Sequence, residues 1–238
     1  MAKKISRIIE NQIKAWKRQS TQTRISIPSI NRFPVITVSR EFGAQGAALA
    51  ELLGEKLDFK VWDKELLQAI SKELGSDQKF LETLDERSQQ MVENTVAGYL
   101  QNIHTNENYL RSLVRVVKTI EEHGSSIIVG RGANYICRNP LSFHVRVVCP
   151  YDKRIALYAE RMNLKRFEAR RIIDRKDTER AEFIERNFYK DVSASSGYDL
   201  VINSGTFTPE QMMRIVLDGY ESKTGRPAAV PGREKVLQ

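Results

Sequence analysis

The stretch VSREFGAQGAALAELL, residues 38–53, decides the fold. It continues an apolar run that begins at residue 34, turns through Gly43 and Gly46, and leads at once into a helical pattern of Ala and Leu. A strand that turns through glycines into a helix is typical of the first βα unit of an open α/β sheet, where the helix N-terminus offers backbone N–H groups to an anion. No Lys or Arg lies between Arg40 and Lys56, so the turn and helix carry no cation of their own.

The alternation of strand and helix continues along the chain. Short apolar runs predict strands at residues 34–39, 59–63, 126–130, 143–149 and 199–203. Helix-length segments lie between them at residues 47–57, 64–75 with a long continuation to 122, 153–189 and 209–221. Strands that are apolar on both faces and alternate with helices indicate a parallel sheet covered on two sides. We therefore expect an α/β fold, a three-layer α/β/α sandwich around a five-stranded parallel sheet.

Composition restricts the class of protein. The chain has 238 residues, of which 41% are hydrophobic and 29% charged, as expected for a globular domain. No apolar run approaches the roughly 18 residues of a membrane span, and the N-terminus lacks the apolar stretch of a signal peptide, so we expect a cytoplasmic protein. Cys137 and Cys149 match no disulfide framework or metal-ligand spacing, which indicates packed, reduced thiols.

The net charge of +8 is concentrated at the ends of the chain. Residues 1–34 contain eight Lys and Arg against Glu10 alone, whereas residues 35–220 contain 26 basic and 27 acidic residues. A near-neutral core does not indicate a nucleic-acid-binding face; only weak binding through the basic tail is expected. The amphipathic pattern from Lys3 to Arg18 predicts a helix that docks on the domain or on a second subunit. We expect no membrane partner.

The loop at residues 39–48 departs from the full phosphate-binding motif. The motif G-x-x-x-x-G-K-[ST] supplies a Lys for the β- and γ-phosphates and a hydroxyl for Mg²⁺. With Gly46 as the last glycine, Ala47 and Ala48 occupy the Lys and Ser/Thr positions. Two interpretations stay open: a nucleotide-binding loop that uses backbone N–H groups, or a purely structural strand-to-helix turn. In the first interpretation the donor-binding residues are Arg40, Gly43, Ala44, Gln45, Gly46, Ala47 and Ala48.

Five ordered motifs resemble one known family: SREFGAQG, VWDKELL, IIVGRGANYI, IIDRKDTER and YDLVINSG. They resemble the cytidylate kinase-like family, relatives of bacterial CMP kinase among the P-loop nucleoside monophosphate kinases, over about residues 34–220. The resemblance implies a P-loop NTPase fold, ATP or another nucleoside triphosphate as donor with Mg²⁺, and a nucleoside monophosphate such as CMP or dCMP as acceptor. The family's loop often reads S-R-[EQ]-[FY]-G-S-G-G-R, so here Gln45 replaces a glycine and Ala47 replaces an arginine.

The resemblance and the composition together define the expected parts of the chain. We expect a basic N-terminal helix and linker at residues 1–33, a kinase-like domain at 34–221 and a flexible tail at 222–238. Within the domain, residues 76–122 form a helical insert and residues 163–192 a lid-like segment. The insert is either a monophosphate-binding subdomain or a contact in a homodimer, and the N-terminal helix is a second candidate for such a contact.

Arginines are the candidate catalytic and binding residues, because phosphoryl transfer needs positive charge around the migrating group. By the resemblance, Arg131 in VGRGAN grips the acceptor phosphate, where a guanidinium can bond two oxygens at once; a structural turn is the alternative. Arg175 and Arg180 match the arginine-rich lid of monophosphate kinases. A helix cap at Asp177 or Thr178 predicts a hairpin that brings these two catalytic candidates together.

Other polar residues have open alternatives. Asp63 ends the second strand and is a substrate-binding candidate, or a contact of water-bound Mg²⁺, with helix N-capping as the alternative. For Arg40 the alternative is an ion pair with Glu41 or a neighbouring loop. The histidines, His104, His123 and His144, have no partner at a suggestive spacing and are expected to be structural. No protein metal site is expected.

Three functions are compatible with the sequence. The first is a phosphotransferase in which the lid arginines close over the transferring group and exclude water. The second is a nucleotide- or anion-binding module of the same fold without useful catalysis, because the Walker Lys and Ser/Thr are absent. The third is an interaction protein tethered to RNA or acidic partners through its basic N-terminus. The lid arginines favour the first function.

Overall fold

The computed structural model describes residues 2–22, 33–72, 75–100 and 107–226. The chain divides into two compact units. We call the first, Met1–Phe33 with Trp62–Gly124, the helical unit, and the second, Pro34–Val61 with Ser125–Gln238, the sheet unit. His104 and most of the linker and tail fall outside the described residues.

The sheet unit is built on a five-stranded parallel sheet. Its strands are β1 (Ile36–Arg40), β2 (Lys60–Trp62), β3 (Ser126–Val129), β4 (Phe143–Val148) and β5 (Leu200–Asn203). The order is β2-β3-β1-β4-β5, with β1 central and paired in parallel with both β3 and β4, and β5 paired in parallel with β4. All five predicted strands are confirmed to within two residues, and so is the parallel α/β sandwich.

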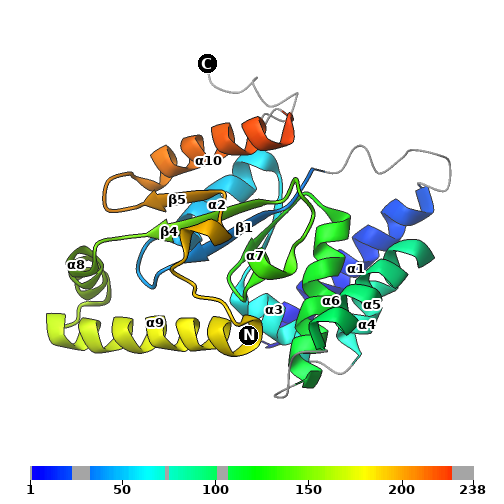
Figure 1. Ribbon diagram of the computed structural model, residues 1–238, viewed down its shortest axis with the longest axis horizontal. Helices are drawn as coiled ribbons and strands as arrows, with labels where there is room; N and C mark the ends of the chain where they lie inside the picture. Colours follow the sequence, from blue (N-terminus) through cyan, green and yellow to red (C-terminus); the bar gives the residue numbers. More distant parts are fainter. Residues whose placement is uncertain (1, 23–32, 73–74, 101–106, 227–238) are drawn as a thin grey trace. The chain divides into compact units, whose positions relative to one another are not determined.

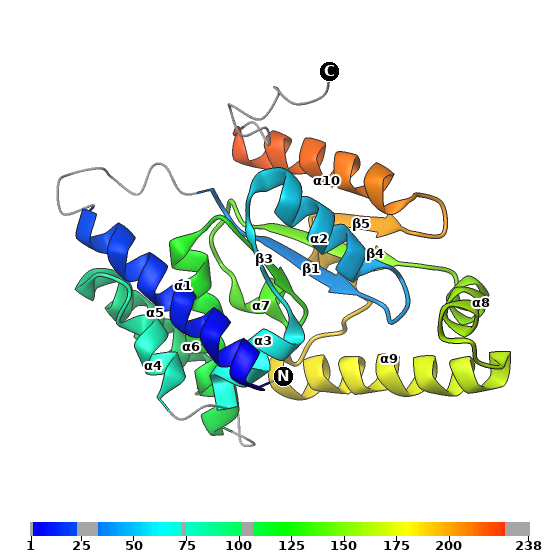
Figure 2. The same cartoon turned by 180° about the vertical axis from the view of Figure 1, so that it is seen from behind.

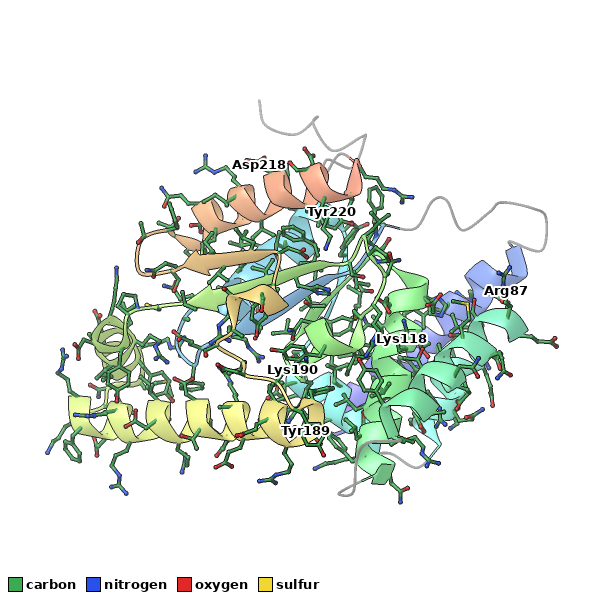
Figure 3. The ribbon with its side chains drawn as sticks, viewed as in Figure 1. Arg87, Lys118, Tyr189, Lys190, Asp218 and Tyr220 are labelled. Carbon is green, nitrogen blue, oxygen red and sulfur yellow. The ribbon has the colours of Figure 1, made fainter. Side chains whose placement is uncertain are left out.

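The helices of the sheet unit are α2 (Gly46–Leu57), α7 (Ala133–Ile136), α8 (Tyr151–Met162), α9 (Arg166–Phe188) and α10 (Pro209–Thr224). Helices α2 and α10 pack on one face, and α7 lies against β1 on the other (Figures 1 and 2). Figure 3 shows Tyr220 on the inner side of α10 and Asp218 on its outer side. The hydroxyl of Tyr220 donates a hydrogen bond to the Pro34 carbonyl over 2.7 Å, which ties α10 to the start of β1.

The sheet face turned away from α2 is polar over β1 and β4. Side chains alternate along a strand, and Thr37 and Ser39 of β1 are level with His144 and Arg146 of β4. Thr37 and His144 are joined by a hydrogen bond of 2.8 Å. The expectation that the strands are apolar on both faces is therefore wrong for this part of the sheet, because these polar side chains find partners on the adjacent strand.

The helical unit contains α1 (Ala2–Gln22), α3 (Lys64–Lys72), α4 (Ser76–Leu81), α5 (Glu86–Leu100) and α6 (Glu107–His123). The N-terminal helix docks on its own chain through Ile9 and Trp16, which are 3% and 6% exposed. The Trp16 ring stacks on His123 at 3.9 Å and meets Phe80 edge-on at 5.4 Å. His123 also hydrogen-bonds Thr83, so this histidine has the structural role expected of it.

The lid segment differs from the prediction. Helix α9 runs without a break from Arg166 to Phe188, as Figure 1 shows for the long yellow helix, so the predicted hairpin at Asp177 or Thr178 is wrong. Its N-terminal half packs on α8, where Ala169 and Ile173 join a small apolar core with Ile155. The Asp177 carboxylate does not cap a helix because it makes contacts with another segment, described below.

Neither Cys137 nor Cys149 is in a disulfide, and both are buried, which confirms packed thiols. Within the described ranges, no helix is both long and apolar enough to cross a membrane.

Candidate functional site

The loop after β1 presents an uncapped helix N-terminus. Its backbone is left-handed at Gly43, with φ +83°, and at Gln45, with φ +60°. Gln45 is the N-cap residue of α2, and its side chain makes no capping hydrogen bond. The first N–H groups of an α-helix have no acceptor within the helix. The N-terminus of α2 can therefore donate to an anion, at the carboxyl edge of the sheet where ligands bind in this fold class.

Two glycines make room for the Arg40 side chain. A Cβ atom at Gly46 would lie 2.7 Å from the Cβ of Arg40, and one at Gly130 would lie 2.0 Å from its Nη1 atom. Real Cβ atoms essentially never approach so closely. The Arg40 side chain therefore runs across the start of α2 and lies against the turn after β3, which carries Arg131.

Helices α8 and α9 hold the backbone of the loop. Asp177 of α9 accepts a hydrogen bond from the Phe42 N–H over 2.7 Å and forms an ion pair with Arg154 of α8. Arg154, only 6% exposed, donates to the carbonyls of Phe42 and Cys149, each over 3.1 Å. Its Nε atom also lies 3.5 Å from a carboxylate oxygen of Glu41. Arg154 and Asp177 thus position the segment between β1 and α2.

Arg180 reaches the same segment from one turn further along α9. Its Nη1 atom donates to the Arg40 carbonyl over 3.0 Å, and its guanidinium lies 5.3 Å from the centre of the Phe42 ring. Burial lowers the pKa of Arg180, the charge of Asp177 partly offsets this, and the charges of Arg154 and Arg131 lower the pKa further. The guanidinium groups therefore repel one another, a conflict that a bound anion would relieve.

Arg131, in the turn after β3, contacts helix α9. Its guanidinium lies 4.7 Å from the centre of the Phe183 ring of α9, and its own backbone is left-handed, with φ +54°. Its buried Nε atom has no hydrogen-bond partner among the described residues. A buried donor without an acceptor is costly, so this N–H group is suited to donate a hydrogen bond to a ligand oxygen.

We call Arg40, Arg131, Arg154 and Arg180 the arginine cluster. They come from the ends of β1 and β3, from α8 and from α9. Glu41 and Asp177 make ion pairs with Arg154, and the charge of Glu179 also acts on Arg180. Guanidinium groups from four elements thus gather beside the loop, an arrangement suited to oxyanions such as phosphates.

Two predicted site residues make other contacts. The Arg175 side chain is exposed and lies 3.8 Å from Glu179 of the same helix, so the structure does not bring it together with Arg180. Asp63, in the helical unit, caps α3 by accepting a hydrogen bond of 2.8 Å from the Leu66 N–H. The capping alternative is thus confirmed for Asp63, and a contact with substrate stays a prediction.

The described residues offer no cluster of three or more His, Cys, Asp or Glu side chains that could hold a metal ion. Mg²⁺ in nucleotide sites is commonly bound by the substrate phosphates with one or two carboxylates. The carboxylates beside the loop are Glu41, which accepts from the Cys149 N–H over 2.9 Å, and Asp177. A magnesium ion here would be held mainly by the phosphates of the donor.

Sequence reasoning missed Arg154 and the role of Asp177. Arg154 lies four residues after Pro150, in the first turns of the helix that follows β4, and that place at the carboxyl edge of the sheet was an available signal. Asp177 was considered only as a helix cap. Its actual partners, Phe42 and Arg154, are 135 and 23 residues away in the chain, so no local pattern could indicate them.

Comparison with known proteins places the chain in a family and a fold. A model of the family described as cytidylate kinase-like matches residues 35–206. A solved structure of an uncharacterized protein from Eubacterium ventriosum has a TM-score of 0.64 at 21% identity, and covers 79% of this chain and 98% of its own. Shikimate kinase from Bacteroides thetaiotaomicron, with a TM-score of 0.41 at 13% identity over 79% of this chain and 97% of its own, is too distant to carry an argument.

A curated relative is similar over a shorter range. Uronate isomerase from Corynebacterium glutamicum is 24% identical over 153 residues, which is 64% of this chain. The matched region is 30% of the length of that relative. The activity in its name therefore belongs to a much longer protein.

Proposed function

The chain belongs to the cytidylate kinase-like family, and we propose that it is a phosphotransferase that moves a phosphoryl group from ATP or another nucleoside triphosphate to CMP, dCMP or a similar small acceptor. The observation that carries this proposal is the arginine cluster beside the loop after β1. Three of its members make electrostatic contact with one another, since Arg131 and Arg154 both lower the pKa of Arg180. Phosphoryl transfer is catalysed chiefly by such positioned positive charge.

Each part has a role in this reaction. The uncapped N-terminus of α2 and Arg40 hold the donor phosphates, Arg131 holds the acceptor phosphate, and Arg180 stabilises the transferring group. Arg154 positions the loop. The donor phosphates would hold Mg²⁺, with Glu41 and Asp177 as the carboxylates beside the loop, and the ion would neutralise part of the phosphate charge. We assign the reaction to the cytoplasm.

A second candidate function is a binding module that holds a nucleotide without useful turnover. Ala47 and Ala48 supply neither the Lys nor the hydroxyl of the full motif. In addition, the Phe42 N–H beside the loop is already bonded to Asp177. Both observations weaken the donor site while leaving the arginine cluster able to bind an anion.

A coupled assay with ATP or GTP, Mg²⁺ and a panel of nucleoside monophosphates tests the proposal. Arg131→Ala and Arg180→Ala should each lower turnover by roughly a hundredfold to a thousandfold, the loss typical of removing one donor to a transition state. Arg186→Ala is the matched control, because this exposed residue of α9 lies 4.0 Å from Glu182 in a solvent-exposed pair. Arg175→Ala tests the remaining lid prediction.

The two candidate functions give different results. Turnover that depends on Arg131 and Arg180 supports the phosphotransferase. Thermal stabilisation by a nucleotide without turnover for any acceptor supports the binding module. A protein that no nucleotide stabilises would contradict both.

A further inference from the structure

Arg146 is a buried cation outside the arginine cluster. It lies in β4 on the polar face of the sheet, level with Ser39 of β1, and is 7% exposed. Its guanidinium lies 5.6 Å from the centre of the Tyr198 ring. Within the part of the chain that the structure describes, no side-chain or backbone oxygen accepts a hydrogen bond from it.

Among the described residues, no carboxylate makes an ion pair with Arg146. The charge of Arg146 lowers the pKa of Asp191 only in small part, and hydrogen bonds from Ser193 are the main cause. The Asp191 side chain is also exposed. No nitrogen atom of Arg146 is fully enclosed without a hydrogen-bond partner, so its guanidinium can donate to an anion that enters from solvent.

Hydroxyl groups lie beside the cation. The Tyr198 hydroxyl donates its single proton to the Val192 carbonyl over 3.0 Å and lies 3.3 Å from Ser39 Oγ, from which it can accept a hydrogen bond. The segment that carries Tyr198 is held in place from α7, because Asn134 donates to the Gly197 carbonyl over 3.3 Å. Cation and hydroxyls are therefore presented from fixed elements: β1, β4 and a braced segment.

We propose that Arg146, Ser39 and Tyr198 form an oxyanion subsite for a carboxylate or phosphate group of the acceptor, in addition to the place of the acceptor phosphate at Arg131. A guanidinium donates to two oxygens of such a group at once, and the two hydroxyls complete its hydrogen bonds. Arg146 lies two residues before the end of β4, at the edge where ligands of parallel sheets bind. That the bound group belongs to the acceptor rests on the proposed phosphotransferase function. The binding of an anion at Arg146 does not depend on that function.

The test is thermal unfolding of the full chain titrated with inorganic phosphate and, separately, with malonate, against sodium chloride of the same ionic strength. Because Arg131 is expected to bind phosphate as well, every titration is repeated in an Arg131→Met background. There we expect Arg146→Met to weaken the apparent affinity about tenfold or more, the effect of losing charge-assisted hydrogen bonds. Arg214→Met, at an exposed position of α10, is the matched control and should leave the affinity unchanged. The anion that binds more tightly identifies the group.

The same variant separates binding from packing. Without anion, Arg146→Met should melt no lower than the parent protein, because Met keeps an apolar side chain of similar length and Arg146 donates no hydrogen bond to the described residues. The proposal would be overturned if Arg146→Met and its parent bound phosphate with the same affinity and also bound malonate with the same affinity. A melting temperature that falls by the same amount with and without anion would also overturn it, since that is the result of a packing role alone.

Conservative variants cover the case in which Arg146→Met does not fold. Ser39→Ala and Tyr198→Phe each remove one hydroxyl and should each weaken binding of the preferred anion severalfold; unchanged affinity in both would overturn the proposal. No nucleotide or turnover enters this experiment. Anion binding at Arg146 in a protein without turnover would therefore contradict only the phosphotransferase, and turnover with no effect of Arg146 on anion affinity would contradict only the subsite.

Discussion

The carboxylate of Asp177 in α9 accepts a hydrogen bond of 2.7 Å from the backbone N–H of Phe42 in the loop after β1. The same carboxylate forms an ion pair with Arg154 of α8. One side chain therefore holds α9, α8 and the loop together. An oxyanion that took the Phe42 N–H would have to displace Asp177, so the contact of α9 with the loop and the occupancy of the loop are linked.

We expect Asp177→Asn to lower the free energy of unfolding by about 1–3 kcal/mol, because Arg154 loses the nearer of its two counter-charges in a largely buried place. Urea unfolding measures this. The deficit should shrink in inorganic phosphate relative to sodium chloride of equal ionic strength, since a bound anion replaces the lost charge. Glu182→Gln, which breaks an exposed pair of the same helix, should cost at most about 0.5 kcal/mol. A deficit that is the same in both salts would show that no anion binds beside Arg154.

Gly46 and Gly130 should respond differently to alanine. At Gly46 the new Cβ meets the Cβ of Arg40 at 2.7 Å, which no rotamer change can relieve, so we expect a loss of about 2 kcal/mol or more as the backbone moves. At Gly130 it meets the end of the Arg40 side chain, which can swing away. There the cost should be about 1–2 kcal/mol, chiefly from the left-handed backbone.

Chemical denaturation of these variants, alone and combined with Arg40→Ala, measures the contact. The loss caused by Gly46→Ala should persist in the Arg40→Ala background, because Ala keeps the Cβ atom. Gly225→Ala is the control for backbone strain alone, since Gly225 has φ +66° and nothing within 4 Å of a new Cβ. If Gly130→Ala were less stable than Gly225→Ala by several kcal/mol, the Arg40 side chain could not swing away from the new Cβ atom, contrary to this prediction.

Tyr135 should make stability depend on alkaline pH. Burial, with a hydrogen bond to Tyr198, raises the pKa of Tyr135 from 10.0 to about 12. The folded state holds the proton more tightly, so the stabilising contribution is complete below the unfolded pKa and is lost as pH rises from 10.0 to about 12. The stability difference between the wild type and Tyr135→Phe should therefore shrink across this window in urea unfolding. Tyr189→Phe, at an exposed side chain (Figure 3), should follow the wild type throughout.

Trp16 should decide whether the N-terminal helix stays docked in the helical unit. We expect Trp16→Ala to destabilise this unit by about 3–5 kcal/mol, because it removes the rings stacked on His123 and against Phe80. Trp62 is then the only tryptophan left of two, so its fluorescence reports on this unit during unfolding. Lys14→Ala, at an exposed position of the same helix, should leave the transition unchanged. If Trp16→Ala also left the unfolding transition unchanged, the docked helix would contribute nothing to stability.

The places of strands and helices could be predicted because they follow from local periodicity. The run at residues 143–149 and the helical pattern after Gly46 each depend on neighbours in sequence, and both are confirmed. The family also followed from local motifs and is confirmed by the match over residues 35–206. Local propensity gave the wrong prediction at Asp177. This residue lies within a continuous helix, and its carboxylate accepts a hydrogen bond from Phe42 in a distant loop.

The sequence by itself thus determined the α/β class, the strand positions, the family and the arginines worth considering, since each is encoded in short-range spacing and residue type. The tertiary structure alone decided which arginines meet. It joined Arg180 to the Arg40 carbonyl 140 residues away, left Arg175 in solvent, and brought in Arg154 and Arg146 from positions without a motif. The reason is physical: parallel strands align at one edge residues that are remote in the chain, and burial and hydrogen-bond geometry there depend on partners that no local window contains.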